Sequence, residues 1–108
     1  MTLDVGEFVH ADGTNPFRSW FEALHADAAA KVTAALARLA AGSFGNVKRI
    51  GAIAEYRIDW GPGHRIYFGR DGEALIILLG GGTKRRQRND IATASQMWAQ
   101  YRARKRKG

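Results

Sequence analysis

The hydrophobic positions in the first part of the chain follow a helical spacing. After Asn15 and Pro16, large apolar residues recur about one helical turn apart, at Phe17, Trp20, Phe21 and Leu24. This spacing predicts a helix that begins at Pro16, with Asn15 as its N-cap and the aromatic stripe in the core. Small and aliphatic residues at the same spacing predict a second helix, with Asp27 as its N-cap and Gly42 just beyond its end. A short strand is predicted ahead of both, within residues 3–9.

From Val47 the hydrophobic period changes from helical to two, which is typical of strands. In the segment 53–60 the apolar set is Ala54, Tyr56, Ile58 and Trp60, and in the segment 64–69 the inward set is His64, Ile66 and Phe68. The intervening Gly61-Pro62-Gly63 predicts the turn of an antiparallel hairpin. Pairing Arg57 with Arg65 satisfies both patterns, because a slip of one residue would bury Arg65 and expose Ile66. We therefore expect the two arginines side by side on a charged, solvent-exposed face.

The rest of the chain completes an α+β pattern. Asp71-Gly72 predicts a second hairpin turn, and the uniformly apolar segment 74–79 predicts a strand covered on both faces. A last helix is predicted from about Asn89, with an apolar seam at Ile91, Ala94, Trp98 and Tyr101. The prediction is one domain over residues 1–108, with two N-terminal helices and one C-terminal helix on one face of a small antiparallel sheet.

The positive charge of the chain is concentrated at one end. The net charge is +7, and residues 84–107 hold nine Lys or Arg against the single acid Asp90. A polyanion or an acidic protein would be attracted to this segment. The alternative for residues 102–107 is a basic tail that serves only solubility.

Several classes of function are disfavoured by what the sequence lacks. It has no cysteine, and its three histidines stand on separate predicted elements, so a metal site is not expected. The run Gly80-Gly81-Gly82-Thr83-Lys84 does not have the P-loop spacing, and no serine lies in a nucleophile-elbow context. Residues 1–10 do not resemble a signal peptide, and no apolar run is long enough to cross a bilayer. We expect a cytoplasmic protein that needs neither metal nor cofactor.

The remaining chemistry is cationic, and it suits cleavage of RNA. An RNA 2′-hydroxyl lies next to the scissile phosphate and can attack it in line, so a protein need only orient the strand, move protons and stabilise charge. Arginine can contribute without a metal, because guanidinium binds phosphate through two hydrogen bonds and stays charged.

The order of motifs along nearly the whole chain resembles the RelE/ParE toxin superfamily, in particular its HigB-like, phage-type group of addiction module killer proteins. The segments that carry the resemblance are Phe17 to Leu24, Arg38-Leu39, 45–48, 55–58, 61–68, 78–84, Gln87 and Asp90-Ile91. The resemblance implies a RelE-like fold and the toxin of a type II toxin–antitoxin pair. Such a toxin is usually a ribosome-dependent endoribonuclease that cuts mRNA and is silenced by a co-encoded antitoxin.

The resemblance also implies roles for individual residues. Arg65 matches an arginine that contacts the scissile phosphate, and Arg57 matches a basic residue used in proton transfer or charge stabilisation. Lys84 and Arg85 match a basic pair of which one member helps to protonate the leaving group. Four further cations are candidates for RNA binding, namely Lys48, Arg49, Arg86 and Arg88.

One family feature is missing, and it leaves alternatives open. RelE itself carries a stacking, catalytic tyrosine in its C-terminal segment, where this chain reads Asn89-Asp90-Ile91, and HigB-type toxins vary at these positions. Tyr67 is the candidate substitute, with a purely structural role as the alternative. For the whole chain the alternatives are a ParE-like inhibitor of DNA gyrase and an inactive homologue that only binds antitoxin. The expected partners are a helix-turn-helix antitoxin in a hetero-oligomer, mRNA and the ribosome, with no membrane.

Overall fold

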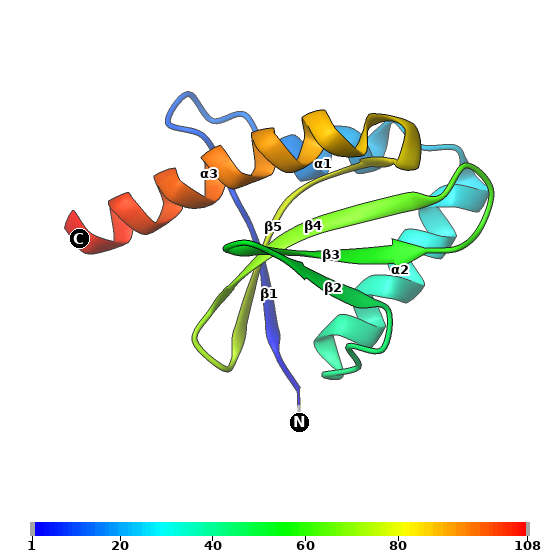
Figure 1. Ribbon diagram of the computed structural model, residues 1–108, viewed down its shortest axis with the longest axis horizontal. Coiled ribbons are helices and arrows are strands. Elements are labelled where there is room, and N and C mark those ends of the chain that lie inside the picture. Colours follow the sequence, from blue (N-terminus) through cyan, green and yellow to red (C-terminus); the bar gives the residue numbers. More distant parts are fainter. Residues whose placement is uncertain (1, 108) are drawn as a thin grey trace.

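The computed structural model describes residues 2–107 and contains a five-stranded sheet and three α-helices. In chain order the elements are β1 (Asp4–Glu7), α1 (Pro16–Glu22), α2 (Ala26–Ala40), β2 (Val47–Ile50), β3 (Ile53–Ile58), β4 (His64–Asp71), β5 (Leu75–Thr83), the 3₁₀ turn η1 (Lys84–Arg86) and α3 (Gln87–Lys107). The predicted helices and hairpins are therefore present. Figure 1 shows their arrangement, with α3 extending past one end of the sheet.

The sheet is mixed, with the strand order β1-β5-β4-β3-β2. Strands β2 to β5 form an antiparallel meander, whereas β1 runs parallel to β5, with Asp4 opposite Leu75 and Glu7 opposite Leu78. The expected RelE-like arrangement with a small antiparallel sheet is therefore wrong, because a parallel strand precedes the helices and forms one edge. Periodicity reveals a strand but not its partner, so the pattern of residues 3–9 could not predict the parallel pairing.

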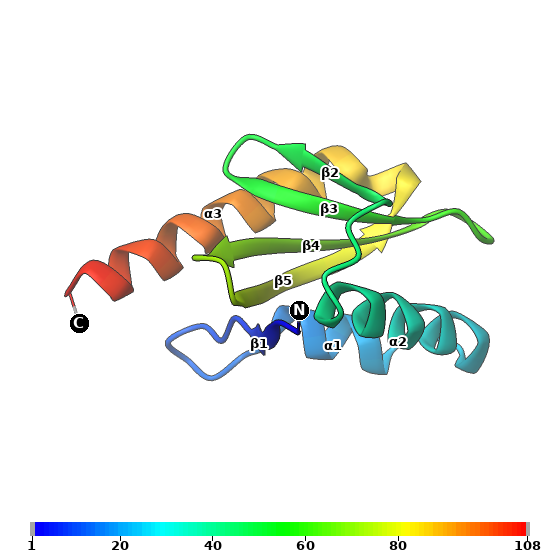
Figure 2. The ribbon, with the colours of Figure 1, turned by 90° about the horizontal axis from the view of Figure 1, so that it is seen from below.

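The helices cover both faces of the sheet, contrary to the prediction of a single covered face. One core cluster joins Phe17 of α1 and Val32 and Leu39 of α2 to Ile66 and Phe68 of β4. The other joins Ala94, Met97 and Trp98 of α3 to alternate strand residues such as Tyr67 and Leu79. Figure 2 shows α1 and α2 on the side of the sheet opposite α3. Strands β4 and β5 are buried on both faces because each face meets a helix.

Glycines on β4 and β5 allow the helices to lie close to the sheet. A Cβ added at Gly81 would overlap with the ring of Trp20 from α1, and one added at Gly82 would overlap with the carboxylate of Asp90 from α3. A Cβ at Gly69 would overlap with the ring of Trp98. Part of the glycine run is therefore required for packing, which explains its presence without any phosphate loop.

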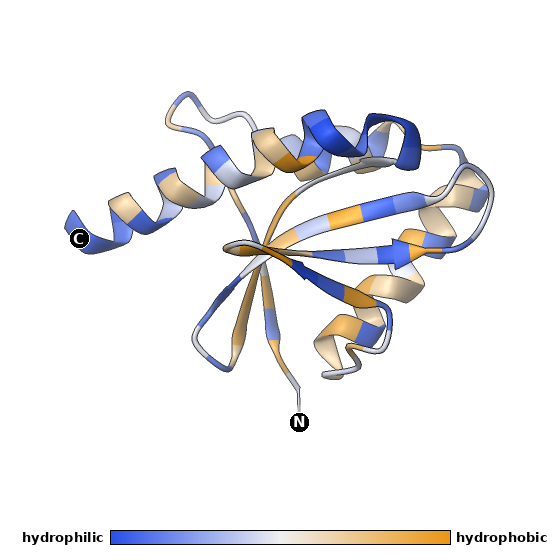
Figure 3. Cartoon of the chain, in the orientation of Figure 1, coloured by the Kyte–Doolittle hydropathy of each residue, from blue (hydrophilic) through white to orange (hydrophobic). Residues whose placement is uncertain are grey.

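The helix ends agree only partly with the predictions. Asn15 caps α1 as expected, since its Oδ1 accepts a hydrogen bond from the backbone N–H of Arg18 at 3.0 Å. Asp27 is not the cap of α2, because His25 is the N-cap residue and Asp27 lies in the first turn. The hydrophilic residues of η1 and the start of α3 gather at one end of the sheet (Figure 3). Within residues 2–107, no helix combines the length and apolar character needed to cross a membrane.

Candidate functional site

Cations from three elements meet near the turn between β3 and β4. Arg57 on β3 lies directly opposite Arg65 on β4, so the predicted register is confirmed. Opposed residues of an antiparallel pair project to the same side, with Cβ atoms roughly 5 Å apart. Lys84, the first residue of η1, donates its backbone N–H to the carbonyl of Gly63 at 3.0 Å, which holds it beside the turn. We call Arg57, Arg65 and Lys84 the arginine–lysine site.

The members of this site differ in exposure. Arg57 and Lys84 are exposed, whereas only 6% of Arg65 is accessible. Within residues 2–107 the only ion pairs are Arg18–Glu7 and Lys105–Asp71, so no carboxylate neutralises any of the three side chains at contact distance. Two like charges placed opposite each other in a sheet are unfavourable unless a counter-charge is present. The arrangement is therefore suited to hold an anion.

Arg65 belongs to a polar layer buried between β3, β4 and α3. Glu55 is fully buried, and one of its carboxylate oxygens accepts a 2.7 Å hydrogen bond from the side-chain amide of Gln87 on α3. Tyr67 lies opposite Glu55 in the sheet and is 1% exposed. Among the described residues, Nε and Nη1 of Arg65 find no hydrogen-bond partner, and the hydroxyl of Tyr67 lies close enough to the Glu55 carboxylate for their interaction to raise the pKa of Tyr67. Unsatisfied buried polar atoms cost stability, so this layer is a functional candidate.

The layer also shifts the pKa values of two acids. Burial raises the pKa of the Tyr67 phenol far above its usual value, and the nearby charges of Glu55 and Asp90 raise it further. Burial also raises the pKa of Asp90, against the opposing effect of Arg86. Tyr67 is therefore a neutral phenol that holds its proton more tightly than usual, which disfavours a role as a base.

The charged, solvent-exposed face expected around Arg57 and Arg65 is thus wrong in part. Its Arg57 end is exposed, but α3 covers the remainder. Because Tyr67 packs in the same cluster as Met97 and Trp98, it has a structural role regardless of any catalytic one. Strand alternation places Glu55 on the same side as Arg57 but does not show that a helix covers that side. The available signal was that Glu55 lies opposite the aromatic Tyr67 in the predicted hairpin.

A groove beside the arginine–lysine site contains a residue that the sequence placed in the core. Trp60 is 36% exposed and lines a groove of about 310 Å³ with Arg57 and with Lys31 and Arg38 of α2. Its ring stacks on His64 at 27° with 6.0 Å between centroids, and the Lys31 ammonium lies 5.7 Å from its centroid. The alternation of β3 misassigned Trp60 because the strand ends at Ile58. Its position next to the turn was the signal for exposure.

The structure does not gather all the other candidate cations at this site. Arg85 and Arg86 are exposed on η1 next to Lys84, and Arg88 is exposed in the first turn of α3. Lys48 on β2 is exposed and lies opposite Glu55 in the sheet register. Arg49 instead lines a separate cleft, so it does not share a surface with the arginine–lysine site.

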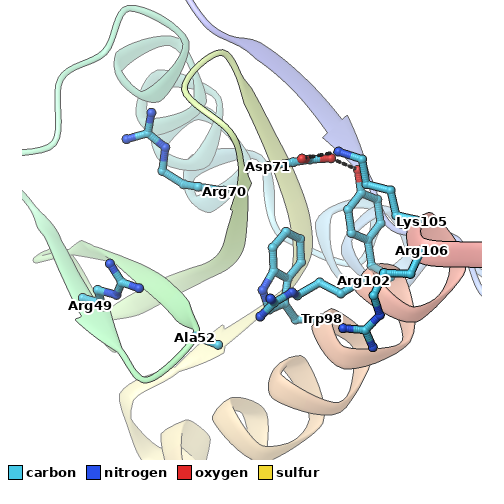
Figure 4. A pocket seen from close by; sticks show the side chains of 9 residues that line it. Arg49, Ala52, Arg70, Asp71, Trp98, Arg102, Lys105 and Arg106 are labelled. Atoms are coloured by element: carbon cyan, nitrogen blue, oxygen red, sulfur yellow. Dashed lines mark hydrogen bonds and ion pairs between the residues drawn. The ribbon is translucent and has the colours of Figure 1, made fainter.

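That separate cleft has a volume of about 510 Å³ and lies between the strands and the second half of α3. Figure 4 shows Arg49 from β2 on one side and Arg102 and Arg106 from α3 on the other, with Trp98 at the base. Arg70, Asp71 and Lys105 complete its charged lining. We call it the cationic cleft.

The arginine–lysine site can bind a phosphate and stabilise negative charge that develops on it. Arg57 and Lys84 provide exposed hydrogen-bond donors, the largely buried Arg65 adds positive charge, and the exposed Trp60 offers an aromatic face alongside. Within residues 2–107, no three His, Asp or Glu side chains are grouped as a metal site would need. The cations of the site can supply electrostatic stabilisation, and an ammonium can also donate a proton.

Comparison with known proteins identifies a relative but no described activity. An uncharacterized protein of Haemophilus influenzae is 42% identical over 83 residues, which cover 75% of this chain and 84% of that protein. No protein-family model matches the chain.

Proposed function

The chain belongs to the same family as this Haemophilus influenzae protein, and from its own site we propose that it is the toxin of a type II toxin–antitoxin system. Its activity is cleavage of mRNA on the ribosome without a metal, which stops translation. The proposal is supported by the motifs that resemble RelE/ParE toxins and by the cations at the β3–β4 turn. It acts in the cytoplasm, where its RNA substrate is found.

The observation that carries the proposal is the pairing of Arg57 with Arg65, with no carboxylate of residues 2–107 in ion-pair contact with either side chain. A structural role for opposed arginines would call for such a partner, whereas a phosphate supplies the missing charge. Lys84 is fixed by its backbone beside the same turn. Three cations then surround one anion from three elements.

The proposed reaction uses the 2′-hydroxyl of the RNA as nucleophile. Its oxygen forms a bond to phosphorus while the bond to the 5′-oxygen breaks, leaving a 2′,3′-cyclic phosphate and a 5′-hydroxyl. Arg57 and Arg65 stabilise the charge on the phosphorane, and Lys84 donates a proton to the leaving oxygen. The proton released by the 2′-hydroxyl passes to solvent water.

The groove beside the site accounts for orientation of the strand. A base stacks on the exposed ring of Trp60, while Lys31 and Arg38 lie along the phosphates and Arg57 reaches the scissile one. Trp60 thereby provides the stacking surface that the C-terminal segment lacks. A partner that fills this groove would silence the protein, which is the role proposed for a helix-turn-helix antitoxin in a hetero-oligomer.

A translation reaction with a defined mRNA tests the proposal. Adding the purified chain should produce cuts within the translated region only when ribosomes are present, and the fragments should end in 2′,3′-cyclic phosphate. An mRNA with a 2′-deoxynucleotide at the mapped position should resist cutting there. Intact mRNA together with loss of gyrase supercoiling would replace the proposal with ParE-like inhibition. If the mRNA stays intact and gyrase is unaffected, the chain is an inactive homologue that only binds antitoxin.

A further inference from the structure

The cationic cleft lies away from the arginine–lysine site. Arg65 is near the start of β4 and Arg70 is near its end, so five residues of extended strand separate them, or about 17 Å. Arg49 on β2 pairs with Ala54, at the end of β3 remote from Arg57. One phosphate group cannot contact both places, so an anion held in the cleft would be distinct from the phosphate at the arginine–lysine site.

The charges in the cleft are fixed in place but not neutralised. Arg49 Nε donates to the carbonyl of Gly51 at 3.2 Å, and Arg70 Nη2 donates to the carbonyl of Glu73 at 2.9 Å. The Arg70 guanidinium also lies 4.8 Å from the centroid of the Phe44 ring. Neutral partners orient a guanidinium without cancelling its charge.

The single acid of the cleft is already occupied. Asp71 pairs with Lys105 and accepts a 2.6 Å hydrogen bond from the Tyr101 hydroxyl. These two hydrogen bonds, that from Lys105 first, hold the pKa of Asp71 below its usual value. Arg102 and Arg106 are one helical turn apart on α3, exposed, and without an ion-pair partner among the described residues. Four arginines therefore present uncompensated charge to the cleft.

The lining favours a phosphate backbone over an acidic peptide. Peptides gain most of their binding energy from apolar anchors that enter well-packed pockets. Both aromatic side chains of the lining already have partners. Trp98 is 95% covered by its own core, and the partly buried Tyr101 stacks on Trp98 and donates its hydroxyl to Asp71, so little apolar surface is left for an anchor. Phosphates need only charge and hydrogen-bond donors, which the four arginines supply.

We propose that the cationic cleft is a second RNA-binding site, which holds the phosphate backbone of a folded, double-stranded RNA segment, because the cleft offers charge to a backbone while its Trp98 ring is too covered to stack on an unpaired base. This inference rests on the proposed function to the extent that RNA is the ligand class, but it requires no cleavage. The arginine–lysine site takes the strand to be cut, and the cleft anchors the protein on structured RNA nearby.

Binding to two synthetic RNAs tests this assignment with the full-length chain. The probes are a hairpin with a perfect duplex stem and an unstructured oligouridylate, both 2′-O-methylated so that neither can be cut. Arg102→Gln with Arg106→Gln removes two charges from the cleft. Arg104→Gln with Lys107→Gln removes the same charge from the same helix outside it, where Arg104 donates to the carbonyl of Val9. Thermal unfolding of the wild type and both double variants controls for folding.

The cleft variant should bind the hairpin roughly tenfold more weakly, and the slope of log affinity against log salt should fall by about 1.4–1.8 for two lost phosphate contacts. The control variant should bind the hairpin with at most a small loss, and oligouridylate binding should change little in either. Equal losses in both variants would reduce the effect to net charge and overturn the site. Unchanged hairpin binding by the cleft variant would also overturn the site, even if the protein cuts mRNA in the translation reaction. If the wild type binds the hairpin and the cleft variant does not, but no mRNA is cut in the translation reaction, the proposed activity alone is refuted.

Discussion

Arg57 and Arg65 are opposite each other in the sheet, yet they are not equivalent targets for mutation. Arg65 is buried in the polar layer, so its truncation would leave a void beside Glu55 and could unfold the protein. Arg57 is exposed, and its loss removes a charge without opening the core. A functional test is therefore cleaner at Arg57 than at Arg65, even though the family resemblance gives Arg65 the more direct role.

Trp60 provides a test of how the substrate strand is held. Trp60→Ala should weaken binding of 2′-O-methylated oligouridylate by roughly 1–3 kcal/mol, the usual contribution of one stacked base. Trp60→Phe should recover most of this loss, because it retains an aromatic face. Fluorescence anisotropy of labelled RNA measures both. If both variants bind the RNA as tightly as the wild type, the proposal that a base stacks on Trp60 is wrong.

Asp90 should make stability depend on pH. An acid whose pKa is raised in the folded state stabilises the fold most below its unfolded pKa of about 3.8, and that contribution is lost as pH rises through the folded value. Asp90→Asn should therefore gain stability relative to the wild type as the pH rises from 4 to 7. Urea unfolding of both proteins at each pH checks the sign. A constant difference between them would mean that Asp90 titrates normally.

At the level of single residues, the sequence predicted positions better than environments. The opposition of Arg57 and Arg65 followed from alternation, because only one register buries Ile66 and Phe68. The burial of Glu55, Arg65 and Tyr67 did not follow, since alternation distinguishes two faces of a strand but does not say whether a distant helix covers the second. Trp60 was misassigned because the pattern was extended past the end of β3.

Among the elements, β5 shows how closely helix packing depends on glycine. Gly81→Ala should destabilise the protein by about 1–3 kcal/mol or more, because the new methyl group would overlap with the Trp20 ring of α1. Gly45→Ala is the matched control, since a Cβ there meets no atom within 4 Å. Denaturant unfolding compares the two. Equal stability of both variants would show that α1 can move away from β5 at little cost.

The elements themselves were largely predictable, while their assembly was not. Aromatic spacing and Asn15 predicted α1, and alternation around Gly61-Pro62-Gly63 predicted the β3–β4 hairpin. The parallel pairing of β1 with β5 joins segments about seventy residues apart, and no local pattern encodes it. The side of the sheet on which α3 packs depends on the path of the chain through η1. Hydrophobic periodicity does not predict that path.

For the whole molecule, different RNA contacts are proposed at opposite ends of β4. Mutations at separated sites usually combine additively, within about 0.5 kcal/mol. Trp60→Ala combined with Arg102→Gln and Arg106→Gln should therefore raise the half-maximal concentration for inhibiting translation by the product of the separate effects. A dose series in a cell-free translation reaction measures this. A combined effect no larger than either alone would indicate a single RNA-binding surface.

The central claim is that the arginine–lysine site cuts mRNA, and mapping 5′ ends in a translation reaction tests it most directly. Arg57→Gln should reduce the rate of ribosome-dependent cleavage by about 10²–10³-fold, as expected when a donor to the transition-state charge is lost, while the unfolding temperature stays unchanged. Arg104→Gln, which removes an exposed arginine outside the site, should cut at the wild-type rate. Wild-type cleavage by a folded Arg57→Gln protein would contradict the account.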